Sequence, residues 1–294
     1  MKHILITGGT GRIATCIAEG LRQTNRFRVY RGTRGETAEP DLYHLDYHDT
    51  EQMESVLSDL QIHTVIHMGF YMRNDHFVEN QIDQNMKNAY YLYEACRRAK
   101  VKRVIFGSSN HVFGFYKKGE HIHSDSLYRP DSAYALAKVF VEMLGRYYAD
   151  RYGLSVFNIR IGNFSEKGNE MPLDKRAAKI WLSNPDCIQL MIRLLDYDEN
   201  CRYLQMFGMS DNDGCYFDTS DNEKVGYRPE SNGAAYLGQL KTQSHFGLEK
   251  SDLDLNLLIR HNYVGGYNIS MDINGGFDLE YLQEIGKDYD PDEG

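Results

Sequence analysis

The side chains whose types and spacing most directly suggest chemistry are Tyr134 and Lys138, four residues apart. Asp131 or Ser132 can cap a helix that begins just after Pro130, and residues four apart on a helix share one face. A phenol has an ordinary pKa near ~10 and is a poor base at neutral pH, but a nearby ammonium favours the phenolate. The pair could therefore move a proton between an alcohol and a carbonyl. The simpler interpretation is that both side chains lie on a solvated helix face. Other motifs in the chain are needed to choose between this and a catalytic pair.

A possible dinucleotide-binding loop follows the first apolar segment. Residues 3–6 form a short strand, and TGGTGRIA at 7–14 leads into a helical pattern. In such a loop Gly8 permits a tight turn and Gly11 permits close approach of a pyrophosphate. The helix that opens at Arg12 and Ile13 would attract the anion with its amino end. A plain glycine-rich turn is the alternative, and the order strand, turn, helix favours the cofactor loop.

Strands alternate with helices along most of the chain, which predicts an α/β fold with a Rossmann-type doubly wound parallel sheet. The predicted strands are 3–6, 27–31, 42–45, 64–69, 101–106, 155–161 and 203–207, and the later helices are 50–60, 80–99, 132–152 and 185–195. Asp49 with Gln52 resembles a capping box for the first of these. Ligands of such sheets bind at the carboxyl ends of the strands. The segments at those ends are Gly8–Gly11, Asp46, Gly69, Ser109 and Ile161-Gly162.

The sequence divides into two parts. Residues 1–162, with the returning strand near 203–207, are predicted to form the dinucleotide-binding domain. Residues 163–200 and 208–294 are polar or rich in Asp, Asn and Gly, and we expect a smaller substrate-covering lobe with a solvated acidic tail.

Composition and charge exclude several classes of partner. The 294 residues carry a net charge of −9, which argues against nucleic acid or an anionic membrane. No apolar run approaches the length of a membrane span, and Met1-Lys2 leads directly into a strand. The five cysteines are scattered without a CxxC pair, so we expect a cytoplasmic protein with reduced thiols and a small-molecule partner.

No metal site is predicted. His44, Asp46 and His48 alternate on one strand, but coincidence is the simpler interpretation. Asp211 and Asp213 suggest a calcium loop, yet the ligand positions before and after them do not fit one.

The end of the second strand bears on the choice of cofactor. NAD is usually held by an acidic residue there, whereas this chain has Arg31 and Arg34 and no acid until Glu36. The two arginines could meet a 2′-phosphate, which favours NADP over NAD. Solvated arginines are the alternative.

The sequence resembles the extended short-chain dehydrogenase/reductases, the NAD-dependent epimerase/dehydratase family. The motifs that carry the resemblance are TGGTGRIA at 7–14, Asp46, His67-Met68-Gly69, Asn85, Ser109 and Tyr134-x-x-x-Lys138. Within the family it most resembles the uronate dehydrogenases. That likeness rests on FGSSNH at 106–111, Gly114-Phe115-Tyr116, Arg129-Pro130-Asp131, Arg160-Ile161-Gly162, Trp181, 210–213 and Gly265-Gly266.

This resemblance implies oxidation of the anomeric C1 hydroxyl of a sugar acid to a lactone. Tyr134 would take the hydroxyl proton, Ser109 would bind the same oxygen, and Lys138 would hold the nicotinamide ribose and depress the pKa of Tyr134. The implied sugar-binding residues are Asn110, His111, Asn163 and Arg176, of which Arg176 would clamp the carboxylate. The implied cofactor-binding residues are Gly8, Gly11, Arg12, Ile13, Arg34, Asp46, Gly69, Lys138 and Ile161.

Departures from the family pattern leave the sugar open. Met72 and Asn163 replace serines, and the loop before Trp181 is longer, so a neutral or phosphorylated sugar is an alternative to a uronate. Two further functions remain: a sugar-nucleotide epimerase or dehydratase, and a non-catalytic dinucleotide-sensing regulator. Helices 80–99 and 132–152 commonly form a dimer face in proteins of this type, so the resemblance also implies a homodimer.

Overall fold

A single parallel sheet forms the centre of the molecule. The computed structural model describes residues 1–35, 39–164, 171–172, 174–240, 263–276 and 278–286. The seven strands lie in the order β3-β2-β1-β4-β5-β6-β9, and every neighbouring pair is parallel. They are β1 (Lys2–Thr7), β2 (Phe27–Thr33), β3 (Leu42–His44), β4 (Thr64–His67), β5 (Arg103–Ser109), β6 (Ser155–Ile161) and β9 (Tyr203–Gly208). The strand order reverses between β1 and β4, where such sheets bind ligands. The predicted Rossmann-type fold is confirmed.

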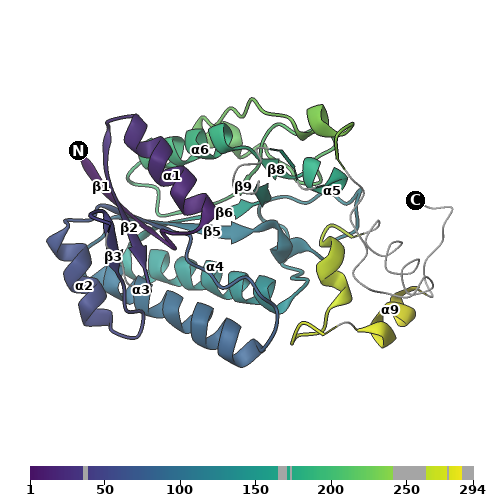
Figure 1. Cartoon of the computed structure of the whole chain (residues 1–294), viewed down its shortest axis with the longest axis horizontal. Helices are drawn as coiled ribbons and strands as arrows, with labels where there is room; N and C mark the ends of the chain where they lie inside the picture. The colour runs from purple at the N-terminus through teal and green to yellow at the C-terminus, as the bar shows by residue number, and fades with distance from the viewer. Residues whose placement is uncertain (36–38, 165–170, 173, 241–262, 277, 287–294) are drawn as a thin grey trace.

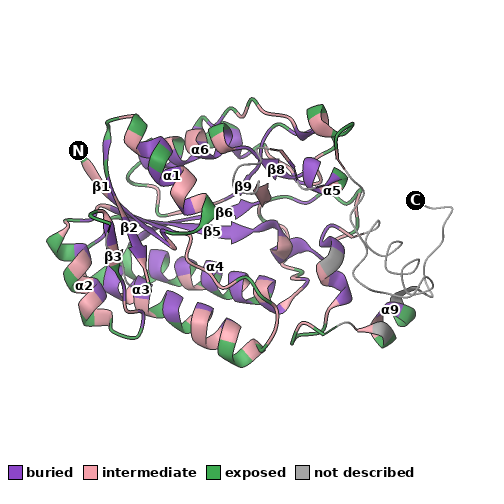
Figure 2. Cartoon of the chain, in the orientation of Figure 1, coloured by how far each residue is buried: buried purple, intermediate pink, exposed green. Residues whose placement is uncertain are grey.

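Helices cover both faces of the sheet (Figure 1). α1 (Arg12–Gln23) and α6 (Asn184–Asp196) cover one face, and α2 (Thr50–Asp59), α3 (Lys87–Arg98) and α4 (Ala133–Tyr152) cover the other. In β1, Ile4 and Ile6 pack with α1 and α6, whereas Leu5 packs with the opposite layer. Successive residues of a strand point to opposite faces of the sheet. The continuous apolar strands therefore contribute side chains to the hydrophobic core on each face. Figure 2 shows these strands as the buried centre.

α6 belongs to the sheet layer, although it falls within the predicted substrate-side range 163–200. Its residues Leu190 and Met191 are buried in the same cluster as Ile17 of α1. A Cβ on Gly20 would lie 2.4 Å from Ile188, so the glycine allows the two helices to approach closely. The sequence predicted a helix at 185–195 but did not identify the surface that it covers.

The helix predicted at 80–99 has a different beginning. Residues Phe77–Met86 form a π-helix, and α3 continues from Lys87 to Arg98. The buried side chains of Gln81 and Asn85 bond to each other at 2.7 Å. Gln81 also donates to the carbonyl of Arg73, and Asn85 pairs with the backbone of Tyr71 at 2.8 and 3.0 Å. The wide helical turns thus hold the loop after β4, and no local propensity would have shown this contact.

Capping residues set the starts of the helices near the strand ends. Ser132 accepts a hydrogen bond from the Ala135 amide and so begins α4, and Asp49 accepts one from the Gln52 amide and begins α2. Gln52 does not close the predicted capping box, because its side chain bonds to the backbone of Asp46 and His44 instead.

Small elements gather beyond the carboxyl ends of the strands (Figure 1). They are β7 (Asn163–Phe164), α5 (Lys175–Ala178), β8 (Trp181–Leu182), α9 (Leu279–Gly286) and short 3-10 turns at Asn110–Phe113, Gly233–Tyr236 and Gly266–Ser270. α7 (Asn222–Val225) instead buries Val225 in the core cluster that α1 and α6 share. Parts of the predicted lobe, including the acidic tail at 288–293, lie outside the described residues. Over the described ranges, no helix has the length and apolar character needed to cross a bilayer.

Candidate active site

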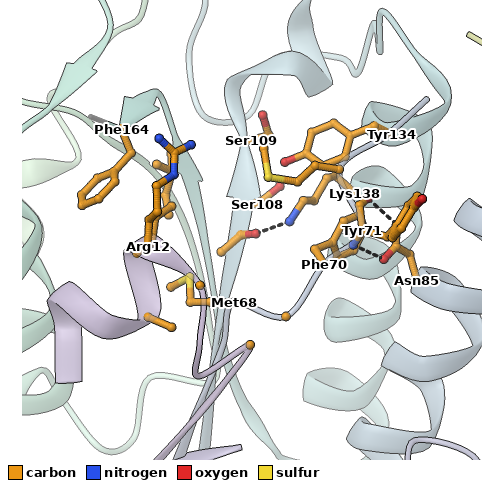
Figure 3. Close-up of a pocket in the computed structure, with 18 of the residues that line it drawn as sticks. Arg12, Met68, Phe70, Tyr71, Asn85, Ser108, Ser109, Tyr134, Lys138 and Phe164 are labelled. Carbon is orange, nitrogen blue, oxygen red and sulfur yellow. Dashed lines mark hydrogen bonds between the residues drawn. The ribbon is translucent and has the colours of Figure 1, made fainter. Parts of the chain in front are cut away.

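A cavity of about 710 Å³ lies at the carboxyl ends of the central strands (Figure 3). It brings together these predicted site residues: Gly8, Gly11, Arg12, Ile13, Arg34, Gly69, Ser109, Asn110, His111, Tyr134, Lys138, Ile161, Asn163 and Arg176. Asp46 is not in its lining, where Tyr47 stands instead. One oxygen of the Asp46 carboxylate accepts a hydrogen bond from the His48 amide at 2.9 Å, and the contact of Asp46 with a nucleotide stays a prediction.

The glycine loop closes one end of the cavity. Gly8 has a φ of 66°, and a Cβ there would lie 2.6 Å from the Cα of Gly69. The ends of β1 and β4 therefore approach at a distance that only glycine permits. Gly11 precedes α1 and makes no side-chain cap, which leaves the amide groups of the first turn for a ligand.

Unsatisfied polar atoms line the same cavity. Asn88 Oδ1, Asn110 Nδ2 and Asn163 Oδ1 are buried, and none has a hydrogen-bond partner among the residues that the structure describes. Buried polar atoms are normally paired, so these three indicate a polar ligand. With the uncapped start of α1, they fit a dinucleotide at one end of the cavity and a hydroxylated substrate at the other.

Tyr134 lies in the first turn of α4, and its ring meets those of Phe70 and His111 edge-on, at 5.6 and 6.5 Å between centres. Burial raises the pKa of Tyr134 to about 12, although a hydrogen bond with Ser109 acts in the opposite direction. Figure 3 shows Tyr134 and Ser109 side by side above Lys138. The phenol is therefore protonated when the cavity holds only protein.

Lys138 is almost fully buried, with 3% of its surface exposed. Its Nζ donates to the carbonyl of Gly107 at 2.5 Å and lies 3.7 Å from the ring centre of Phe70 and 4.7 Å from that of Phe106. Burial lowers the pKa of Lys138 well below its ordinary value. In this structure burial raises the pKa of Tyr134 and the Lys138 ammonium faces the Gly107 carbonyl, so a lowering of that pKa by Lys138 stays a prediction.

His111 is held by a buried carboxylate. Its Nδ1 lies 2.6 Å from Oδ2 of Asp131, whose side chain has no exposed surface. Asn268 Nδ2 lies 3.2 Å from the same ring nitrogen and also lines the cavity. Asp131 was predicted as an alternative helix cap, a role that Ser132 takes, and as part of the Arg129-Pro130-Asp131 motif, without a role toward His111. Nothing in the sequence pattern pointed to Asn268, because it comes from a segment far along the chain.

Arg176 extends from α5, which Asp174 caps through the Ala177 amide at 2.7 Å. The guanidinium donates to the carbonyl of Val264 through Nε, at 3.1 Å, and through Nη2. Burial lowers the pKa of Arg176. Among the described residues Arg176 forms no salt bridge with a carboxylate, so its charge remains available to an acidic ligand.

The two arginines after the second strand differ. Arg31 is 9% exposed and bonds to Asp41 at 2.8 Å, to Glu39, and to the carbonyl of Gly9. Its predicted contact with a 2′-phosphate is therefore wrong, because its guanidinium is already engaged. Arg34 is exposed and lines the cavity beside Gln84, which accepts its hydrogen bond at 2.5 Å. Glu36 lies outside the described residues.

The departures from the expected family pattern also face the cavity. Met72, which is 68% exposed, and Asn163 both line it. Of the rejected metal candidates, His44 lies near the carbonyl of Gly35, and the described residues contain no group of three or more metal-binding side chains.

Comparison with known proteins agrees with this geometry. Residues 4–184 match the NAD dependent epimerase/dehydratase family. A uronate dehydrogenase from Pseudomonas syringae pv. tomato is 32% identical over 82% of this chain and 86% of its own. An L-arabinose 1-dehydrogenase (NAD(P)(+)) from Haloferax volcanii is 30% identical over 81% of this chain and 100% of its own. The crystal structure of a glucuronic acid dehydrogenase from Chromohalobacter salexigens superposes with a TM-score of 0.78 at 25% identity, covering 93% of this chain and 98% of that one. The chain therefore belongs to the NAD dependent epimerase/dehydratase family, as its glycine loop and its Tyr134–Lys138 pair predicted.

Proposed function

We propose that this protein is an NAD(P)-dependent dehydrogenase that oxidises the anomeric C1 hydroxyl of a uronic acid, or of a closely related sugar, to the lactone. The observation that carries the proposal is the presence of Ser109, Tyr134 and Arg176 in one cavity with the glycine loop. A proton acceptor, a hydroxyl donor and a cation for an acid group are thus supplied to one ligand. The similar uronate and arabinose dehydrogenases support a sugar substrate oxidised at C1.

The protein side chains would divide the work as follows. When bound, the nicotinamide accepts the hydride that leaves C1. Tyr134 receives the hydroxyl proton, and Ser109 donates a hydrogen bond to the same oxygen. Because burial raises the pKa of Tyr134 to about 12, Lys138 would have to reorient toward the phenol to favour the phenolate during turnover. Lys138 would leave the Gly107 carbonyl to hold the ribose hydroxyls.

The other end of the cavity would bind the sugar. Arg176 presents a planar guanidinium that suits both oxygens of a carboxylate. The unpaired amide atoms of Asn110 and Asn163 would bond ring hydroxyls, and so would His111. For the cofactor, we propose that Arg34 contacts a 2′-phosphate when NADP is bound, with NAD as the alternative.

We also propose a homodimer. Leu136, Phe140, Met143 and Tyr147 are between 39% and 55% exposed and recur on one side of α4, and Tyr90 of α3 is 46% exposed. Such a stripe on adjacent helices suits a second copy of the chain. Location in the cytoplasm is supported by the five cysteines, which form no disulfide in the described part of the chain.

Absorbance of the reduced nicotinamide tests the proposal. The protein is mixed with NAD or NADP and with glucuronate, galacturonate, their neutral parent sugars or glucose 6-phosphate. Net reduction with a uronate is expected, and reduction confined to a neutral or phosphorylated sugar would refute the carboxylate clamp. Conversion of a sugar nucleotide without net reduction would establish the epimerase alternative, and binding without any turnover would establish the regulator. Arg34→Ala is expected to weaken binding of NADP much more than that of NAD.

A further inference from the structure

A buried charge network lies directly behind Lys138. Glu142 follows Lys138 by one helical turn on α4 and has no exposed surface. Its carboxylate accepts hydrogen bonds from Ser108 Oγ, from Tyr128 at 2.8 Å and from Gln205 at 3.0 Å. Donors from β5, β9 and the segment before α4 therefore converge on this one carboxylate.

Arg160 of β6 completes this network. Its Nη2 lies 2.8 Å from Oε2 of Glu142, and its Nε lies 3.2 and 3.3 Å from the two carboxylate oxygens. The guanidinium also donates to the carbonyl of Ser124 and lies 4.6 Å from the ring centre of Phe113. Arg160 is only 1% exposed, so a buried cation and a buried anion are held together by many contacts.

Lys138 needs a counter-charge because burial disfavours its ammonium form. Its close neighbours are the Gly107 carbonyl and the Phe70 and Phe106 rings, which carry no formal charge. Glu142 is the carboxylate that favours the charged form of Lys138.

The other titratable groups that face this pair do not change charge near neutral pH. From β4, His67 has a pKa lowered to about 3 by burial, so it is neutral. On α4 itself, burial raises the pKa of Tyr134 to about 12. Around Glu142, burial raises the pKa values of Tyr93 on α3, Tyr128 and Tyr203 on β9.

We propose that Glu142 is a positioning residue that keeps the buried Lys138 ammonium charged and, through Ser108, fixes the strand end that carries Ser109. This proposal rests on the proposed dehydrogenase function only where kcat/KM is measured. Its other measurement, cofactor binding, is already implied by the family assignment. Ser108 and Ser109 are adjacent in β5, and the bond from Ser108 to Glu142 ties that strand to α4. One carboxylate thus connects two of the three residues expected to act on the substrate.

The test is the pH dependence of NADH or NADPH binding, followed by nucleotide fluorescence in the wild type and in Glu142→Gln. Affinity should fall as pH rises through the pKa of Lys138, because only the ammonium donates to the ribose hydroxyls with a full charge. Removing a charge ~6 Å away at an effective dielectric constant of about 20 should move this fall to lower pH by about one to two units. The upper limb of the kcat/KM profile should move by the same amount.

Two further variants separate this role from a structural one. Glu142→Gln leaves Arg160 buried without its partner, so the double variant E142Q/R160M removes both charges. It should retain the fold and show a pH shift in the same direction but smaller, because the loss of the Arg160 cation partly offsets the loss of the carboxylate. The matched control is Glu94→Gln, because Glu94 accepts from Arg97, Arg98 and Tyr148 but does not line the cavity. It should leave the pH profile unchanged.

Three results would overturn the proposal. One is wild-type pH dependence of cofactor binding in both Glu142 variants. Another is an equal shift in Glu94→Gln. The third is persistence of the pH-dependent fall in Lys138→Met, which would show that Lys138 does not cause it. If no sugar is oxidised by the wild type, the proposed function fails, while the binding titration still decides the role of Glu142.

Discussion

Replacing Asp131 by asparagine should damage the substrate site far more than the fold. The Asp131 carboxylate lies 2.6 Å from His111 Nδ1 with no exposed surface. Because a carboxylate only accepts hydrogen bonds, it fixes the ring proton on Nδ1 and makes Nε2 an acceptor. An asparagine amide can donate to Nδ1, which moves the proton to Nε2 and reverses what His111 offers to a sugar hydroxyl.

The magnitude follows from the type of bond that is lost. A hydrogen bond to a charged group contributes about 1.5–3 kcal/mol, which corresponds to roughly a 10- to 150-fold loss in kcat/KM. The site has little room to adapt, because a Cβ on Gly114 or Gly265 would lie 1.8 or 2.3 Å from the same carboxylate. We expect most of the loss to appear in KM, since His111 is proposed to bind the sugar and Tyr134 to receive the proton.

The assay is steady-state reduction of the nicotinamide with the best sugar acid, together with the melting temperature of each variant. Ser132→Ala is the control. It removes a 2.9 Å bond to Asp131 and the cap of α4, costing about 1 kcal/mol of stability, but leaves the contact with His111. The reasoning would be refuted by an Asp131→Asn variant with wild-type kcat/KM, or by equal losses in the two variants.

Three other substitutions test separate parts of the site. Tyr134→Phe should lower kcat by roughly 10²- to 10⁴-fold while cofactor fluorescence titrations stay unchanged; near-normal kcat would remove Tyr134 from the chemistry. Arg176→Ala should raise KM for a uronate by at least about tenfold, whereas the exposed neighbour Lys175→Ala should not, and an unchanged KM would exclude the clamp. Gly8→Ala should weaken cofactor binding and lower the melting temperature, with a cost of about 1–3 kcal/mol from its positive φ and the 2.6 Å contact with Gly69; wild-type values of both would contradict it.

The sheet could be predicted because each of its strands and helices has a recognisable local sequence pattern. Apolar runs such as residues 4–6 suit burial on both faces, and the glycines of the first loop mark the turn into α1. The packing of α6 on α1 could not be predicted, because an amphipathic stripe does not specify its partner. The π-helical turns at Phe77–Met86 depend on side-chain bonds to the loop after β4, which no local preference encodes.

Within the site, spacing placed Tyr134 and Lys138 correctly on one helix but did not give their electrostatics. Burial, to which the ring of Phe70 contributes, raises the pKa of Tyr134, whereas its hydrogen bond with Ser109 acts in the opposite direction. Likewise, the sequence could not show that Arg31 forms an ion pair with Asp41. An arginine at the end of a strand gives the same sequence pattern whether or not it has an acidic partner. Charge balance in a buried site is a property of the assembled chain.

Two adjacent glycines explain why the far end of the chain belongs to this site. Gly265 has an ordinary φ of −65° but lies against Asp131, so it is needed for space. Gly266 has a φ of 61° and would place a Cβ 2.8 Å from Nε of Arg176, so it is needed for backbone conformation as well. The two glycines thus lie between the carboxylate of Asp131, which contacts His111, and the guanidinium of Arg176, which is proposed to bind the acid. Val264 supplies a carbonyl to Arg176 and Asn268 lies 3.2 Å from His111, so this segment packs against two of the residues proposed to bind the sugar.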